Sequence, residues 1–274
     1  MAEEQKDKVL STENNTVFQA KPTSMKIDID YFKYVVCGDD FKLNDKITLH
    51  HPTLDEIKEF GEQKYLTLIS TLTMRPYDDM VGLDDAGLNY QDLNDYDMFL
   101  RNYSVITPDF SSIIFGELDF SKFILVKNNE NDTLAIYNQE EDILIDELLY
   151  NYIATFIRTI NFISSKIEYD AGNELMRKYL IKKKRKEIER RKKNPKKFES
   201  QLASIVSFLC SIEGCKYNYT TIRELKIGQL YDNYYRIAII DERNRTLSIM
   251  STGMVKSNDI DKSKLDWTRK IMKE

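Results

Sequence analysis

Apolar and polar residues recur along this chain with two periods, one typical of helices and the other of strands. Over 202–212, apolar side chains recur at intervals of three and four residues, which predicts an amphipathic helix. The broader apolar face of 142–165 predicts a long helix that is buried on more than one side. Two apolar runs, 123–126 and 133–137, flank a turn-rich stretch and predict a β-hairpin.

Local signals place further elements before residue 80. Two apolar runs, 31–36 and 47–49, predict a pair of strands with a turn near Gly38. Thr53 and Glu56 have the spacing of a capping box, so we expect a helix that runs to about Phe60. A second helix follows the break at Gly61, and its apolar face begins at Tyr65.

Three more helical regions follow. The acidic segment 77–99 predicts short helices, separated by loops at Gly82 and Gly87. Residues 173–193 predict a basic helix that ends at Asn194, because the residue before a proline is disfavoured in the helical conformation. Another capping box, Thr221 with Glu224, predicts a final helix that extends to about Ile237.

These elements predict an α+β fold, with a mostly helical body, two small β-hairpins and one long basic helix. Changes of composition divide the chain into four parts. We expect a flexible polar N-terminal tail (1–24), an α+β domain (25–170), the basic helix (171–197) and a C-terminal helical region (198–274).

Composition narrows the class of protein. The chain has 274 residues, of which 42% are hydrophobic, so it can bury a substantial core. Three cysteines exclude a disulfide scaffold, and a net charge of −5 argues against nucleic-acid or membrane binding by the molecule as a whole. No apolar stretch is long enough for a membrane span, and the polar N-terminus does not resemble a secretory signal. We therefore expect a soluble intracellular protein with no membrane contact.

The sequence predicts neither catalysis nor a cofactor. It contains two histidines, no glycine-rich phosphate loop and no nucleophile elbow, so no catalytic constellation is evident. The aspartates of 77–99 do not alternate as a calcium loop requires. Cys37, His50, Cys210 and Cys215 do not have zinc-site spacing, and we expect no metal.

The basic run is the strongest charge signal in the chain. Eleven Lys or Arg residues lie between Ile181 and Lys197, against the two acids Glu187 and Glu189. The run contains no aromatic residue for base stacking, so we favour a solvated helix or a protein-docking surface over a nucleic-acid site. The acidic segment is its natural counterpart, within one subunit or between two. A cluster of tyrosines with Phe208 fits core packing better than a binding groove.

Two blocks of the sequence resemble a known family. The first spans 49–101 and contains Met74-Arg75-Pro76-Tyr77-Asp78-Asp79 and Leu93-Asn94-Asp95-Tyr96-Asp97; the second contains Tyr217-Asn218-Tyr219, residues 225–236 and Lys264-Leu265-Asp266-Trp267. Together they resemble uncharacterised proteins from tail gene clusters of phages and prophages of Gram-positive bacteria. The resemblance covers less than half of the chain and excludes the basic helix and the N-terminal tail.

The resemblance implies a non-enzymatic tail morphogenesis protein, similar to tail assembly chaperones that bind tail tube or tape-measure subunits. The alternatives are a structural tail or baseplate component of the virion and a nucleic-acid-binding protein that uses the basic helix. We expect the host cytoplasm as location, or the virion tail if the protein is structural, and homo-oligomers are compatible with either. The expected partner-binding residues are Met80, Leu83, Asp84, Asp85, Leu93, Asp95, Phe99, Lys182, Lys183, Lys184, Arg185, Lys186, Arg190 and Arg191.

Overall fold

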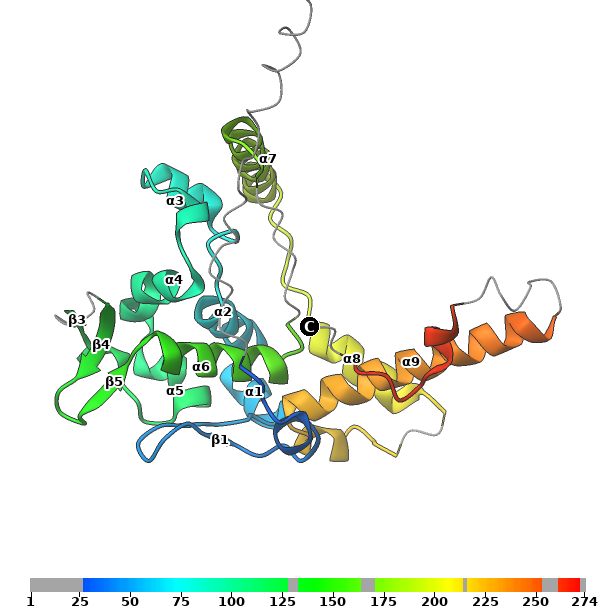
Figure 1. The fold of residues 1–274 in the computed structure, drawn as a ribbon. Coiled ribbons are helices and arrows are strands. Elements are labelled where there is room, and N and C mark those ends of the chain that lie inside the picture. Colours follow the sequence, from blue (N-terminus) through cyan, green and yellow to red (C-terminus); the bar gives the residue numbers. More distant parts are fainter. Residues whose placement is uncertain (1–26, 128–132, 164–170, 214–215, 253–260, 272–274) are drawn as a thin grey trace, which may run out of the picture.

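A computed structural model describes residues 27–127, 133–163, 171–213, 216–252 and 261–271. Figure 1 shows a helical body flanked by two small sheets, from which two parts extend. Helix α7 lies apart from the body beside α3. Helices α8 and α9 form an arm on another side, and α9 projects well beyond the body.

The elements follow one another in a helix-rich order. The strands are β1 (Phe41–Lys42), β2 (Thr48–Leu49), β3 (Ile124–Lys127), β4 (Leu134–Asn138) and β5 (Ile143–Ile145). The helices are α1 (Leu54–Phe60), α2 (Glu62–Leu72), α3 (Met80–Asp85), α4 (Asp95–Asn102), α5 (Pro108–Phe115), α6 (Glu147–Ile160), α7 (Glu174–Lys193), α8 (Gln201–Ser211) and α9 (Ile227–Ser251). Short helical turns are η1 (Phe32–Val36), η2 (Tyr90–Asp92), η3 (Tyr103–Val105), η4 (Phe120–Lys122), η5 (Thr221–Glu224) and η7 (Lys262–Leu265).

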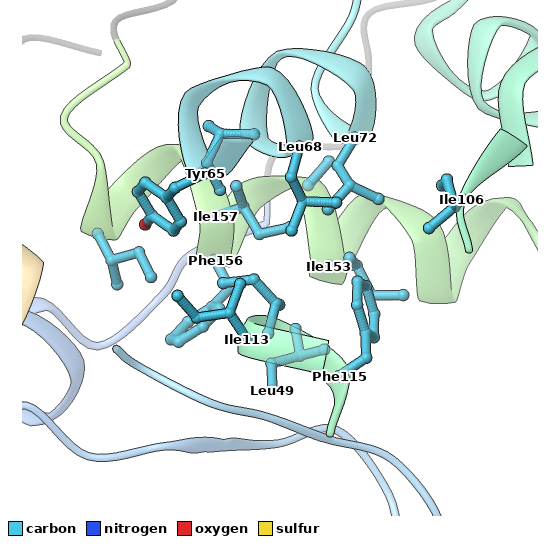
Figure 2. Close-up of a cluster of buried hydrophobic side chains, with 14 of the residues drawn as sticks. Leu49, Tyr65, Leu68, Leu72, Ile106, Ile113, Phe115, Ile153, Phe156 and Ile157 are labelled. Carbon is cyan, nitrogen blue, oxygen red and sulfur yellow. The ribbon is translucent and has the colours of Figure 1, made fainter. Parts of the chain in front are cut away.

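Helix α6 runs through the centre of the body. It buries Ile153, Phe156 and Ile157 against α2, α5 and β2, as Figure 2 shows. The β3–β4–β5 sheet is antiparallel and covers one end of this core, and the β1–β2 hairpin is also antiparallel. The predicted α+β class, with a mostly helical body and small antiparallel sheets, is confirmed.

Several local predictions are confirmed. Thr53 and Glu56 form both hydrogen bonds of the predicted capping box at the start of α1. The basic helix α7 ends at Asn194, before the proline. Strands β3 and β4 form the predicted hairpin, with Val126 opposite Ala135.

Two predictions near strands are wrong. Residues 32–36 are helical instead of extended, because a helical turn places Tyr31, Tyr34 and Val35 on one side. On that side Tyr34 packs edge-on against Phe156 of α6. The long helix expected from 142 begins only at Glu147, since Ile143–Ile145 pair with β4 and add a third strand to the second hairpin.

Two helix boundaries also differ from the prediction. Gly82 lies inside α3, where the Asp79 carboxylate leaves no room for a Cβ, and the chain turns only at Gly87. The turn that begins at Thr221 is a separate 3₁₀ turn, while α9 starts at Ile227 and extends far beyond the predicted end. The expected tail 1–24 lies outside the described residues.

Candidate interaction surfaces

The acidic segment and the basic helix contact each other within the chain. Met80 and Leu83 of α3 are buried with Tyr90, Met98 and Ile181 in a small hydrophobic cluster, which is separate from the main core. Ile181 is the buried apolar residue of α7, at the start of its basic run. The apolar side chains that we expected to face a partner protein are therefore covered by α7 in this conformation.

Ion pairs surround this cluster. The guanidinium of Arg185 contacts Asp84 at 3.0 Å and Asp85 at 2.6 Å. Arg177, about two helical turns earlier on the same side of α7, lies 4.0 Å from Asp84 and also donates to Glu174. Exposed ion pairs contribute little individually, so the buried apolar contacts provide most of the stability and the ion pairs fix the register of α7 on α3.

The other expected partner residues of the acidic segment also have internal contacts. Leu93 is half-buried and packs against the small cluster. Asp95 accepts a hydrogen bond from Arg158 of α6 at 2.6 Å. Phe99 belongs to the main core and stacks on Tyr150, with ring centroids 4.8 Å apart. None of these three side chains offers a large exposed surface.

The basic residues of the run in α7 differ in their contacts. Arg185 and Lys184 are half-buried on the side of α3, and Arg191 pairs with Glu187 on α7 itself. Another set is exposed and has no ion-pair partner within the described part of the chain; it comprises Lys182, Lys183, Lys186, Arg190 and Lys193. A positively charged surface therefore remains on the side of α7 that faces away from α3.

A buried histidine joins the arm to the body. The Nε2 atom of His51 accepts a hydrogen bond from the Gly228 backbone N–H at 2.9 Å, in the first turn of α9. A Cβ on Gly228 would lie 3.0 Å from this ring, so glycine permits the close approach. Burial lowers the pKa of His51 to about 4, and the nearby charge of Lys226 adds to the effect.

A carboxylate of the body caps the other arm helix. Glu62 of α2 accepts hydrogen bonds from the Gln201 and Leu202 backbone N–H groups at 3.0 and 3.1 Å, and from the Ser200 hydroxyl. These donors have no partner within α8, and the negative charge favours the positive end of the helix dipole. The roots of both arm helices are thus fixed to the body by specific polar contacts.

The projecting part of α9 carries exposed apolar side chains. Ile240 and Leu247 are 38% and 39% exposed, and Ile237, on the same side of the helix, is half-buried and packs against the main core. We call these three residues the arm stripe. It continues from a groove between α8 and α9 that includes Phe208 and Tyr234, whose rings are 5.6 Å apart. On another side of α9, η7 folds back, and Arg236 donates to the Trp267 carbonyl.

The aromatic cluster expected in the core is divided: Tyr217 and Tyr231 are half-buried and pack against the main core, whereas other members lie exposed along the arm. Tyr231 and Tyr235 pack with Phe162, but Tyr235 is exposed, as are Tyr219 and Phe208. Sequence periodicity does not distinguish burial in the core from exposure along the arm. The burial of each aromatic side chain depends on how far α9 extends from the body.

The residues considered as metal ligands are dispersed. His50 contacts the carboxylates of Asp40 and Glu56, Cys37 is exposed, and Cys215 lies outside the described residues. In the described ranges, no three His, Cys, Asp or Glu side chains are arranged to hold a metal ion. Within the same ranges, no helix has the length and apolar character that spanning a membrane requires.

Comparison with known proteins gives one match, and it falls on the arm. Residues 192–272 match the family model of the YomV second domain. The match begins in the last turn of α7 and includes α8, η5, α9 and η7. No curated protein and no solved structure matches the chain.

The matched family indicates the kind of genome with which this domain is associated. The YomV second domain belongs to a phage-derived family of the Bacillus prophage type. The arm of this chain therefore matches a phage-associated domain family, which fits a phage protein. The body, with α1 to α6, lies outside the match.

Proposed function

We propose that this chain is a non-enzymatic phage protein of tail morphogenesis, which binds tail tube or tape-measure subunits before they polymerise, as a tail assembly chaperone does. The phage-derived arm supports the phage part of this proposal. The resemblance of 49–101, 217–219, 225–236 and 264–267 to tail-cluster proteins supports the tail-specific part.

The exposed arm stripe is the observation that carries this proposal. Exposed apolar side chains on a rigid element, bordered by polar residues, are typical of protein-binding surfaces. Ile240 and Leu247 lie on a helix whose root is held by His51 and whose far end projects from the body. A chaperone needs such a surface to cover the self-assembling face of its client.

The test is a pull-down of tail tube and tape-measure subunits from the same gene cluster by the full chain. Replacement of Ile240 and Leu247 by serine is expected to reduce capture by about tenfold or more, because two apolar contacts of an interface are lost. A matched control replaces Ile124 and Leu144, which are 56% and 48% exposed on the three-stranded sheet, by serine. This control is expected to capture as much client as the unchanged protein.

Two outcomes contradict the proposal. If neither subunit is captured by the unchanged chain, the assignment to tail assembly is wrong. If the sheet variant loses as much capture as the stripe variant, the client does not bind through the arm stripe.

A further inference from the structure

The outward side of α7 presents a row of positive charge, with the exposed acid Glu189 at its edge. Lys182, Lys186 and Arg190 follow at intervals of four residues, so they lie one above another on the helix. Lys183 and Lys193 flank this row, and all five side chains are exposed. The contacts of Arg177 and Arg185 with α3 hold the opposite side of α7, so the row faces away from α3.

An aromatic side chain lies at the start of the same row. Tyr179 is 60% exposed and precedes Lys182 and Lys183 by about one helical turn on the outward side. It lies outside the basic run itself, so the composition of the run alone does not reveal it. Cations beside an exposed aromatic ring are the combination that contacts the backbone and bases of nucleic acids.

The length of the row matches the charge density of a nucleic acid. Lys182 and Lys193 are separated by a helical rise of roughly 16 Å, and duplex DNA carries about ten phosphate charges over that length. A single α-helix also has the width that the major groove admits. The row can therefore neutralise several phosphates at once without a change in the backbone of α7.

Other anionic partners fit the row less well. A protein interface buries an apolar centre and is depleted of lysine, but the outward side between Lys182 and Lys193 carries no apolar side chain. A helix that lies on a membrane needs an apolar side along its length, and the apolar side of α7 at Ile181 is covered by α3. The acidic residues Asp84 and Asp85 are already paired with Arg185. Glu189 lies at the edge of the row, but the five cations outnumber it, so the row keeps a net positive charge.

We propose that the outward face of α7 binds the phosphate backbone of nucleic acid. The binding is independent of base sequence, because lysine and arginine contacts to phosphates carry no sequence information. This activity uses a different surface from the arm stripe, so it does not depend on the proposed function.

The test measures binding of the full chain to a labelled short duplex DNA and to a single-stranded RNA by fluorescence anisotropy, over a series of salt concentrations that starts near 50 mM. We expect micromolar affinity that falls steeply with salt. The test variant replaces Lys182, Lys183, Lys186 and Arg190 by alanine, which preserves helix propensity. It is expected to bind roughly tenfold or more weakly, with a salt slope smaller by about 3 to 4.

The control variant replaces four exposed lysines on other elements by alanine and therefore carries the same net charge; these are Lys42, Lys58, Lys122 and Lys262. Its affinity is expected to stay within about twofold of the unchanged chain, because phosphate contacts act at short range in salt. The nucleic acid that the chain binds with higher affinity, duplex DNA or single-stranded RNA, is the preferred ligand of this surface.

Three results would overturn the proposal. The first is no retention of either nucleic acid near 50 mM salt. The second is equal affinity of the test and control variants, which would place any binding elsewhere. The third is equally tight binding of polyglutamate or of anionic vesicles, which would indicate an acidic protein or a membrane surface as the partner.

Discussion

Acidification is expected to loosen the junction between arm and body, through protonation of His51. The folded state holds the pKa of this histidine near 4, against an ordinary value of 6.5, so the unfolded chain binds the proton more readily. The stabilisation that neutral His51 contributes is therefore fully present above about pH 6.5 and is lost as the pH falls toward 4. Since one pKa unit corresponds to about 1.4 kcal/mol, the full loss is about 3 kcal/mol.

The assay is chemical unfolding between about pH 7 and pH 4.5, compared with a His51→Gln variant. Glutamine retains a side-chain oxygen that can accept from the Gly228 N–H, but it does not titrate in this range. Subtraction of the two pH profiles removes the contributions of other groups. Among these is Glu56: burial alone would raise its pKa, but hydrogen bonds from Thr53 and His50 lower it to about 2.

A second readout is hydrogen exchange at the Gly228 amide, whose protection should fall over the same pH range because its acceptor becomes protonated. Parallel pH profiles for the unchanged chain and the His51→Gln variant would refute this reasoning. They would mean that His51 is not held in its neutral form by the fold.

Two further substitutions test the contacts that hold α7 and α8. Glu62→Ala removes the carboxylate that caps α8 and is expected to cost about 0.5–2 kcal/mol, measured by thermal unfolding; an unchanged stability would show that the cap is not formed. Ile181→Ala removes the buried anchor of α7 on α3 and is expected to cost about 2–5 kcal/mol locally, measured by hydrogen exchange of α7; unchanged protection there would contradict the packing.

Elements with strong local signals could be predicted from the sequence. The capping box of Thr53 and Glu56, the basic helix and the β3–β4 hairpin depend on neighbouring residues, which a single sequence displays directly. The amphipathic pattern of 202–212 likewise identifies α8, although only Leu202 and Leu209 in it are fully buried.

Errors arose where distant contacts decide the conformation. Residues 32–36 contain apolar residues that suit a strand. In the folded chain, the Tyr31 hydroxyl donates a hydrogen bond to Asp232, and the Tyr34 ring packs on Phe156. The helical turn places both side chains for these distant contacts. The sequence predicts the start of a helix where β5 lies, because the pairing of β5 with β4 is not visible in a short apolar run.

The location of the candidate surfaces also depends on contacts between residues that are far apart in the sequence. Met80 and Leu83 look like an exposed apolar stripe in an acidic segment, and the sequence does not show that Ile181, about a hundred residues later, covers them. The junction through His51 was also missed, since the partner of an isolated histidine is not encoded near it. The sequence does contain a signal for the proposed nucleic-acid-binding face of α7, since Tyr179 precedes Lys182 and Lys183 at helical spacing.

The central claim is that the chain acts during tail assembly and is not retained in the particle. Quantitative mass spectrometry of infected cells and of purified mature particles, from the phage or prophage that encodes the chain, tests it most directly. We expect an abundant protein in infected cells and its absence from particles. Stoichiometric presence in mature particles would contradict it and identify a structural component of the tail or baseplate.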